Sequence, residues 1–185
     1  MTAPLRPSLT HTGIYVRDLA RMTRFYTEIM NLHISDRGHG FSMPVNIVFM
    51  TADPTKHHQF VLAEGRAADA PSSINQASFK VGTLDELRTM YERVKAAGVE
   101  KLRGINHGNA WSVYFEDPEG NTIEIYLDTP WYIGQPHGDS LDLSLSNEEI
   151  FRQTEAMCRQ DAHFMPVAEW EAKMRGDLGL KGTQS

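Results

Sequence analysis

The sequence contains little cysteine and no long hydrophobic run. Its one cysteine, Cys158, excludes an intramolecular disulfide and a cysteine-based zinc site. No apolar stretch approaches the roughly 20 residues that cross a bilayer. The N-terminal segment MTAPLRPSLTH has no apolar run of the kind that a secretory signal requires. We therefore expect a protein of a reducing compartment, the cytoplasm.

Positively charged residues are also fewer than negatively charged ones. The 185 residues include 18 Lys and Arg against 24 Asp and Glu, a formal net charge of −6. This balance argues against nucleic acid or an anionic membrane as the main partner. The sequence also lacks GxGxxG, P-loop, GxSxG and HExxH motifs. The 41% hydrophobic and 23% charged residues are typical of an ordinary globular protein.

An internal repeat organises most of the chain. Residues 11–26 (HTGIYVRDLARMTRFY) align without gaps with residues 76–91 (QASFKVGTLDELRTMY) at an offset of 65. The ends of the two halves also correspond, because DPTKHHQFVL resembles DPEGNTIEIYL. The chain is therefore interpreted as a duplicated module of about 60 residues.

The hydrophobic pattern predicts the elements of each half. We predict a βαβββ module in each half, of which the pattern locates the first strand, the helix and two further strands around an Asp-Pro turn. The predicted strands are 10–16, 45–50, 58–62, 77–81, 111–115 and 122–127, and the predicted helices are 19–32 and 84–97. The fold class is thus α+β, with two paired modules forming a curved mixed sheet around one cleft.

The pattern changes after residue 127. We expect one domain over residues 1–132, with modules at about 8–65 and 74–128, and a C-terminal extension over 133–185. The extension should contain two short helices, one starting at the Ser-Asn-Glu-Glu of 146–149 and one over 167–178. Its aromatic side chains need a surface of this chain or of a neighbouring subunit to bury against: Trp131, Tyr132, Phe164 and Trp170.

Four metal-competent side chains recur at matching places of the repeat. His11 and Gln76 align at the first strand of each half, and His58 and Glu124 fall at the last strand, at most two residues apart in register. A single histidine on a strand is more often structural than a ligand. Four such residues facing one cleft nevertheless suit a divalent metal, and two His with one carboxylate is the arrangement of non-haem Fe(II) oxygenases.

The paired modules and the segment WSVYFEDPEGNTIEIYLDTPWY resemble the vicinal oxygen chelate superfamily, which includes glyoxalase I, extradiol dioxygenases, fosfomycin resistance enzymes and bleomycin-binding proteins. The resemblance covers about residues 8–132 and is greatest to single-domain type I extradiol ring-cleaving dioxygenases. It implies that His11 and Glu124 bind the metal and that His58, His107 and Tyr114 are catalytic. The family's second metal histidine is replaced by Gln76, so a set of His11, His58 and Glu124, with Gln76 as a weaker ligand, is an alternative.

The resemblance implies cleavage of a catecholic substrate by O₂ with Fe(II) as cofactor, with Zn, Ni or Mn as alternatives, and a homodimer or higher homo-oligomer. Two other functions stay open, a glyoxalase-I-like lyase or isomerase and a metal-free module that binds an aromatic compound. Candidates for an apolar wall, each also explicable as core, are Phe41, Met43, Met50 and Trp111. Candidates for binding the carboxylates of glutathione, each also explicable as solvated, are Arg17, Arg37 and Arg103.

Overall fold

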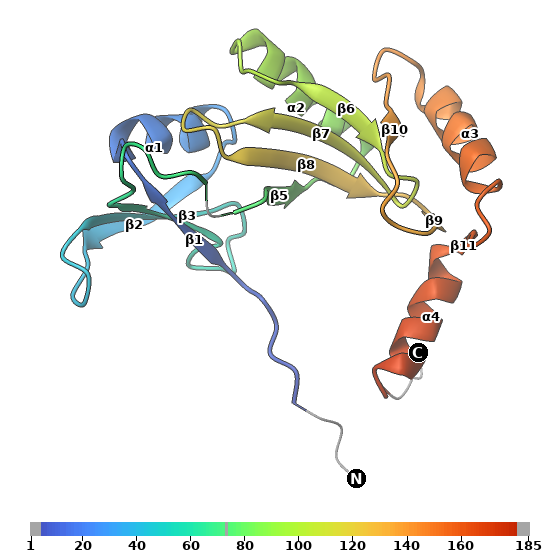
Figure 1. Ribbon diagram of the computed structural model, residues 1–185, viewed down its shortest axis with the longest axis horizontal. Helices are drawn as coiled ribbons and strands as arrows, with labels where there is room; N and C mark the ends of the chain where they lie inside the picture. Colours follow the sequence, from blue (N-terminus) through green and yellow to red (C-terminus); the bar gives the residue numbers. More distant parts are fainter. Residues whose placement is uncertain (1–4, 73, 181–185) are drawn as a thin grey trace.

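The first half of the chain folds as one βαβββ module. The computed structural model describes residues 5–72 and 74–180; the ends of the two expected regions, 1–4 and 181–185, and Ser73 lie outside the described residues. The sheet of this first module has the strand order β1-β4-β3-β2, with β1 and β4 parallel (Figure 1). The elements are β1 (Thr12–Val16), α1 (Leu19–Glu28), β2 (His33–His39), β3 (Asn46–Thr51) and β4 (Phe60–Glu64).

The second half repeats this arrangement. Its first and last strands, β5 and β8, are again parallel neighbours in a sheet of order β10-β6-β7-β8-β5. The predicted duplication is therefore confirmed in the strand order as well as in the sequence. The elements are β5 (Ala77–Lys80), α2 (Leu84–Ala96), β6 (Arg103–Asn106), β7 (Ala110–Glu116) and β8 (Thr122–Asp128).

The two module helices start at matching polar residues. The side chain of Asp18 accepts a hydrogen bond from the backbone N–H of Arg21 over 2.9 Å. Thr83 and Glu86 form a capping box at the start of α2. Each cap satisfies backbone N–H groups that have no partner inside the helix. Helix α2 ends just before Gly98, whose φ of +66° suits glycine.

Two strands of the modules, β2 and β6, and the two-residue strands β9, β10 and β11 were missing from the sequence prediction. In β2 the side chains are mostly exposed, so polar residues occupy most of its positions and the apolar alternation is weak. β6 has four residues, too few for a clear period. Both strands lie outside the parallel pairs β1–β4 and β5–β8 in their sheets, so their omission does not alter the predicted architecture.

The C-terminal extension packs against the second module of its own chain. The predicted helices are present, and Ser146 caps the first of them as expected. Trp131 packs against Trp111 and Phe151, and Tyr132 stacks on Trp170 with ring centroids 5.3 Å apart. The elements are β9 (Trp131–Tyr132), β10 (Asp139–Ser140), α3 (Asn147–Cys158), β11 (Met165–Pro166) and α4 (Val167–Asp177). No described helix is long and apolar enough to cross a membrane.

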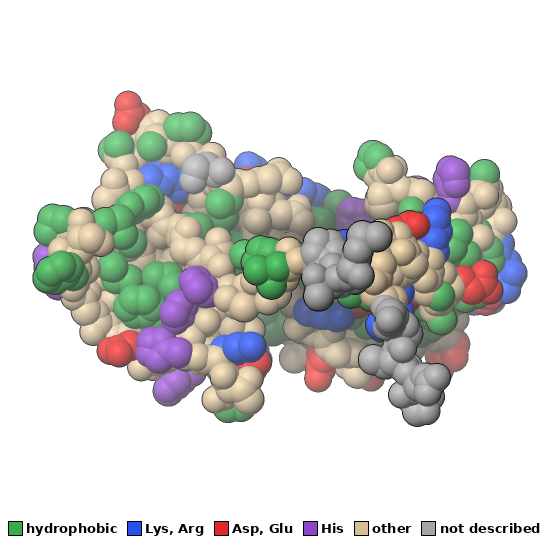
Figure 2. Space-filling model, turned by 90° about the horizontal axis from the view of Figure 1, so that it is seen from below, with side chains coloured by type: hydrophobic (Ala, Val, Ile, Leu, Met, Phe, Trp, Pro, Cys, Tyr) green, Lys and Arg blue, Asp and Glu red, His purple; other side chains and the backbone are tan. Residues whose placement is uncertain are grey.

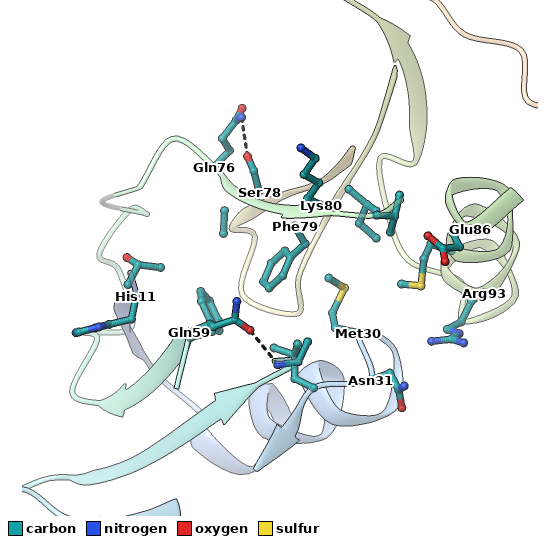
Figure 3. Close-up of a pocket in the computed structure, with 18 of the residues that line it drawn as sticks. His11, Met30, Asn31, Gln59, Gln76, Ser78, Phe79, Lys80, Glu86 and Arg93 are labelled. Carbon is teal, nitrogen blue, oxygen red and sulfur yellow. Dashed lines mark hydrogen bonds between the residues drawn. The ribbon is translucent and has the colours of Figure 1, made fainter. Parts of the chain in front are cut away.

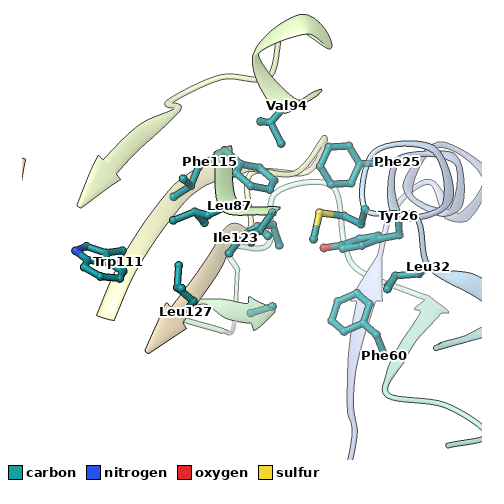
Figure 4. Close-up of a cluster of buried hydrophobic side chains, with 14 of the residues drawn as sticks. Phe25, Tyr26, Leu32, Phe60, Leu87, Val94, Trp111, Phe115, Ile123 and Leu127 are labelled. Atoms are coloured by element: carbon teal, nitrogen blue, oxygen red, sulfur yellow. The ribbon is translucent and has the colours of Figure 1, made fainter. Parts of the chain in front are cut away.

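The modules share one hydrophobic core. Figure 4 shows Phe25 and Tyr26 of α1 facing Phe115 and Ile123 of the second module. The phenol of Tyr26 also donates a hydrogen bond over 2.9 Å to Asp117 in the turn between β7 and β8. The module helices α1 and α2 lie on the same side of the two sheets, whereas α3 and α4 lie at the far end of the molecule (Figure 1).

Candidate functional site

The second sheet presents a polar face on the side away from α2. Side chains alternate between the faces of a strand, and here Ile123 and Ile125 point into the core. Ser78, Glu124 and Tyr114 lie side by side on the other face, because Glu124 is the register partner of both Ser78 and Tyr114. The sheet thus brings three polar side chains from β5, β8 and β7 together.

Glu124 is the centre of this group. Its Oε2 accepts hydrogen bonds from Gln76 Nε2 over 2.8 Å and from the Ser78 hydroxyl over 2.6 Å. Its Oε1 accepts the Tyr114 hydroxyl over 2.5 Å. Glu124 is only 7% exposed, so these three donors replace most of the water that a carboxylate needs.

His107 extends the group by one residue. Its Nε2 lies 3.0 Å from the Tyr114 hydroxyl and 4.0 Å from Glu124 Oε1. Tyr114 has one hydroxyl proton, which cannot be donated to both neighbours. If that proton goes to Glu124, the bond to His107 needs a proton on Nε2. The chain from His107 through Tyr114 to Glu124 can therefore carry one mobile proton.

The environment keeps Tyr114 protonated. Burial raises the pKa of Tyr114, and its hydrogen bond to the carboxylate of Glu124 raises this pKa further. The guanidinium of Arg103 lies over the Tyr114 ring, 5.1 Å from its centroid. Arg103, considered above as a ligand for a carboxylate, thus lies beside the polar group, whereas Arg17 bonds to the carbonyls of Ala67 and Ala70. Arg37 is exposed.

A separate histidine group lies on the first sheet. The rings of His11 and His58 contact one another with centroids 4.4 Å apart, and His57 Nδ1 lies 2.9 Å from His58 Nδ1. His58 also contacts Phe49 edge-on. Partial removal from water lowers the pKa of His58, and the neighbouring His11 and His57 lower it further. Figure 2 shows histidine side chains gathered beside an apolar area on this side of the molecule.

The predicted register of His58 was wrong. Gly13 pairs with Val61, and Ser78, its counterpart in the repeat, pairs with Glu124. Val61 is therefore the true equivalent of Glu124, and His58 lies three residues earlier, before β4 begins. The shared Asp-Pro turn misled the alignment because the segment between this turn and the last strand is longer in the first module by one residue.

The donors have the right chemistry for a divalent metal but are divided between the sheets. Two imidazoles, His11 and His58, lie just before strands of the first sheet, whereas the amide of Gln76 lies just before β5 and the carboxylate of Glu124 lies on β8, both in the second module. Within residues 5–72 and 74–180, no group of three or more His, Cys, Asp or Glu side chains could hold a metal ion. The described chain therefore does not assemble the ligand set by itself.

A large cavity lies between the two modules. Its volume is about 1030 Å³, and His11 and Gln76 lie at its edge on different sheets (Figure 3). Phe79 and Met30 line its inside. Ser78, which sequence reasoning missed, also lines the cavity and connects it to Glu124 by a hydrogen bond. Ser78 follows Gln76 by two residues, so strand alternation could have indicated it.

The expected apolar wall is not formed by the residues proposed for it. Phe41 is fully exposed and Met43 is 41% exposed, so neither encloses a ligand. Met50 and Trp111 are buried in the core, and Trp111 points toward α3, where its indole N–H bonds to Thr154. The apolar lining of the cavity comes instead from residues of both modules: Met30, Leu32, Phe60, Phe79, Val81, Met90 and Ile125.

Comparison with known proteins agrees with this architecture. A family model described as the Glyoxalase/Bleomycin resistance protein/Dioxygenase superfamily matches residues 8–125. The chain is 27% identical over 154 residues to biphenyl-2,3-diol 1,2-dioxygenase 2 of Rhodococcus globerulus, covering 74% of this chain and 77% of that protein. It is also 27% identical over 128 residues to biphenyl-2,3-diol 1,2-dioxygenase 3 of the same organism, covering 66% of this chain and 64% of that protein.

Solved structures show the same fold. A glyoxalase/bleomycin resistance protein/dioxygenase domain from Frankia sp. EAN1pec matches with a TM-score of 0.58 at 24% identity, over 68% of this chain and all of that one. A fosfomycin resistance protein from Listeria monocytogenes, solved with Mn(II) and sulfate, matches with a TM-score of 0.52 at 23% identity, over 68% of this chain and 95% of that one. The family match ends at residue 125, so the C-terminal extension from residue 133 lies beyond it.

Proposed function

Since the chain belongs to the Glyoxalase/Bleomycin resistance protein/Dioxygenase superfamily, we propose that it is a metal-dependent extradiol dioxygenase. The substrate is a catecholic aromatic compound, and both atoms of O₂ enter the ring-opened product. The observation that carries the proposal is the hydrogen-bonded chain of His107, Tyr114 and Glu124, in which Glu124 also bonds to Gln76 and Ser78 at the cavity. The similarity to two biphenyl-diol dioxygenases supports the same reaction class.

The cavity suits the aromatic part of such a substrate. Binding sites for small molecules usually have apolar walls and a few convergent polar groups. Here Phe60 and Phe79 provide aromatic wall, while Gln76 and Ser78 provide polar groups at one end. A catechol ring would lie against the two phenylalanines, with its hydroxyl groups directed to the end formed by Gln76, Ser78 and His11.

The side chains of this protein would hold and move protons. In the proposed reaction His107 and Tyr114 exchange one proton along their 3.0 Å contact, and Glu124 stabilises the Tyr114 hydroxyl at the other end. His58, whose lowered pKa favours the neutral imidazole at pH 7, serves as a base for a substrate hydroxyl. While His58 acts as a base, His11, Gln76 and Glu124 would be the residues that hold Fe(II), which would supply the binding and reduction of O₂. If His58 were a ligand in place of Gln76, it would no longer be free to act as the base.

The divided donors lead us to include a second copy of the chain in the proposal. In a symmetric dimer each interface patch is used twice, so the histidine group of one copy can meet Glu124 of the other at two equivalent sites. Exposed side chains of the first module favour such burial, since Tyr15 is 52% exposed and Met43 is 41% exposed. A closing movement within one chain is the competing explanation.

Metal content and oxygen uptake test the function. Protein purified without oxygen or a chelating tag should contain near-stoichiometric iron and consume O₂ with catechols, forming a yellow product. Tyr114→Phe should lose about 100-fold in kcat, whereas Tyr126→Phe, on the same strand face as Glu124, should keep it. Zinc or nickel without O₂ uptake would indicate a lyase or isomerase. Aromatic binding that survives chelators would indicate a binding module.

Mixing two inactive variants tests the shared site. His11→Ala and Glu124→Gln should each lose iron binding and turnover. If sites form between copies, co-refolding equal amounts yields some pairs with one intact site, restoring about a quarter of wild-type iron and activity for random dimers. If each site lies within one chain, the mixture stays inactive, which contradicts the shared site and leaves the dioxygenase proposal standing.

A further inference from the structure

The C-terminal extension holds the loop that carries His107. His107 comes from the turn between β6 and β7, whereas Ser78, Tyr114 and Glu124 come from strands. A turn defines a side-chain position less firmly than a strand does. The extension, residues 133–180, surrounds this turn, and its strand β10 pairs with β6 immediately before it.

Two residues of the extension bind His107 itself. The side-chain amide of Gln135 donates a hydrogen bond to the carbonyl oxygen of His107 over 2.8 Å. The carbonyl oxygen of His137 lies 2.6 Å from His107 Nδ1. Because a carbonyl only accepts hydrogen bonds, Nδ1 must carry a proton. The ring is therefore held with Nδ1 toward the extension and Nε2 toward Tyr114.

Deeper contacts fix the rest of the turn. Thr154 in α3 is fully buried, and its hydroxyl oxygen accepts a hydrogen bond from the amide of Asn106 over 2.8 Å. Gly108 has a φ of +78°, and a Cβ there would lie 2.3 Å from Ile133 and 3.3 Å from Cys158. These contacts with Thr154, Ile133 and Cys158 restrict movement of the turn relative to the extension.

We infer that the extension is a positioning element of the site, in which Gln135 and the His137 carbonyl fix the ring of His107 so that Nε2 meets the Tyr114 hydroxyl. The role in turnover rests on the proposed dioxygenase function. The positioning of the ring does not, since it follows from the contacts alone. Nothing in the family match assigns a role to this segment, because the match ends at residue 125.

The test compares Gln135→Ala with Gln153→Ala. Both glutamines are exposed and lie on the extension, but Gln153 bonds to Glu149 at the surface of α3. Histidine side-chain NMR with ¹⁵N labelling should show a slowly exchanging proton on His107 Nδ1, assigned by its loss in His107→Gln. Gln135→Ala should speed this exchange at least tenfold and lower kcat with little change in KM, whereas Gln153→Ala should change neither.

Two results would overturn the inference. One is an Nδ1 proton that exchanges freely in the wild type. The other is a Gln135→Ala protein whose Nδ1 signal and kcat equal those of Gln153→Ala, even if its melting temperature falls. If the Nδ1 signal behaves as expected but no catechol is cleaved, the positioning stands and the dioxygenase function fails. The two proposals are thus tested separately.

Discussion

The hydroxyl of Tyr26 and the carboxylate of Asp117 form a 2.9 Å hydrogen bond between the two modules. Asp117 also accepts the backbone N–H groups of Glu119 and Asn121, which fixes the turn between β7 and β8. The bond is buried, so water does not compete for either group. This pair therefore contributes both to the union of the modules and to the position of β8, which carries Glu124.

Removing this bond should destabilise the whole domain. We expect Tyr26→Phe to lower the free energy of unfolding by about 1–3 kcal/mol, because a buried carboxylate loses a donor. Urea unfolding followed by tryptophan fluorescence measures this loss. Tyr15→Phe is the matched control, since Tyr15 is half exposed and its hydroxyl contacts the sulfur of Met43, a weak acceptor. Equal urea midpoints for the two variants would contradict the assignment.

Gly108 and Gly120 have the same backbone conformation, so substitutions at these two positions separate the cost of backbone strain from the cost of a steric clash. Gly108 has φ of +78° and Gly120 has φ of +77°, but a Cβ at Gly120 meets nothing within 4 Å. Gly120→Ala should therefore cost about 1–2 kcal/mol from the left-handed backbone alone. Gly108→Ala should cost a further 1–3 kcal/mol or so through its clash with Ile133. Chemical unfolding of both variants checks the difference, and equal losses would show that the extension yields at this turn.

Alkaline pH should destabilise the protein through its buried phenols. Burial, together with Asp117, raises the pKa of Tyr26, and burial with Glu124 raises that of Tyr114. The folded state thus holds these protons more tightly than the unfolded state. Their contribution is complete below the usual pKa of about 10 and is lost as pH rises toward the folded values. Unfolding measured from pH 9 upward should show a slope that Tyr26→Phe reduces; an unchanged slope would refute this.

The thiol of Cys158 should be inert in the folded protein. Burial raises its pKa to about 11, so at pH 7 only about one thiol in ten thousand is the reactive thiolate. Its contact with the Gly108 carbonyl further restricts access. Iodoacetamide should label the native protein far more slowly than the urea-unfolded chain. Comparable labelling rates would mean that α3 detaches readily from the turn at residues 106–109.

The sequence allowed the architecture to be predicted because the duplication carries strong local signals. Asp18 and Thr83 begin helices at equivalent positions, and the Asp-Pro turns precede the last strands. These signals depend on neighbouring residues only. β2 escaped prediction because its side chains are mostly exposed and thus need no apolar alternation.

The site was predicted less completely because it depends on contacts between distant segments. Glu124, Tyr114, Gln76 and His107 were identified, and the structure brings them into one hydrogen-bonded group. The contact of His107 with the His137 carbonyl could not be predicted from the sequence, since a residue of any type at position 137 has a backbone carbonyl. The grouping of His11 with His58 instead of Glu124 depends on how the two modules are oriented.

The hydrogen bond between Tyr26 and Asp117 has no equivalent between the matching residues of the repeat. The equivalent residues are Tyr91, which lies beneath Lys95, and Asp53, which bonds to Thr55. The cavity opens where their contact would be, between α2 and the loops at Asn31 and Ala52. On the cavity side the modules are joined by an exposed hydrogen bond from Arg93 to the Ile29 carbonyl over 3.4 Å, so the buried bond of Tyr26 and Asp117 is the firmer connection and serves as a hinge. We expect the two modules to rotate about this hinge as rigid bodies, which widens the cavity while the core stays intact. The size of the molecule that the cavity can bind is then limited by this rotation and not by side-chain rearrangement.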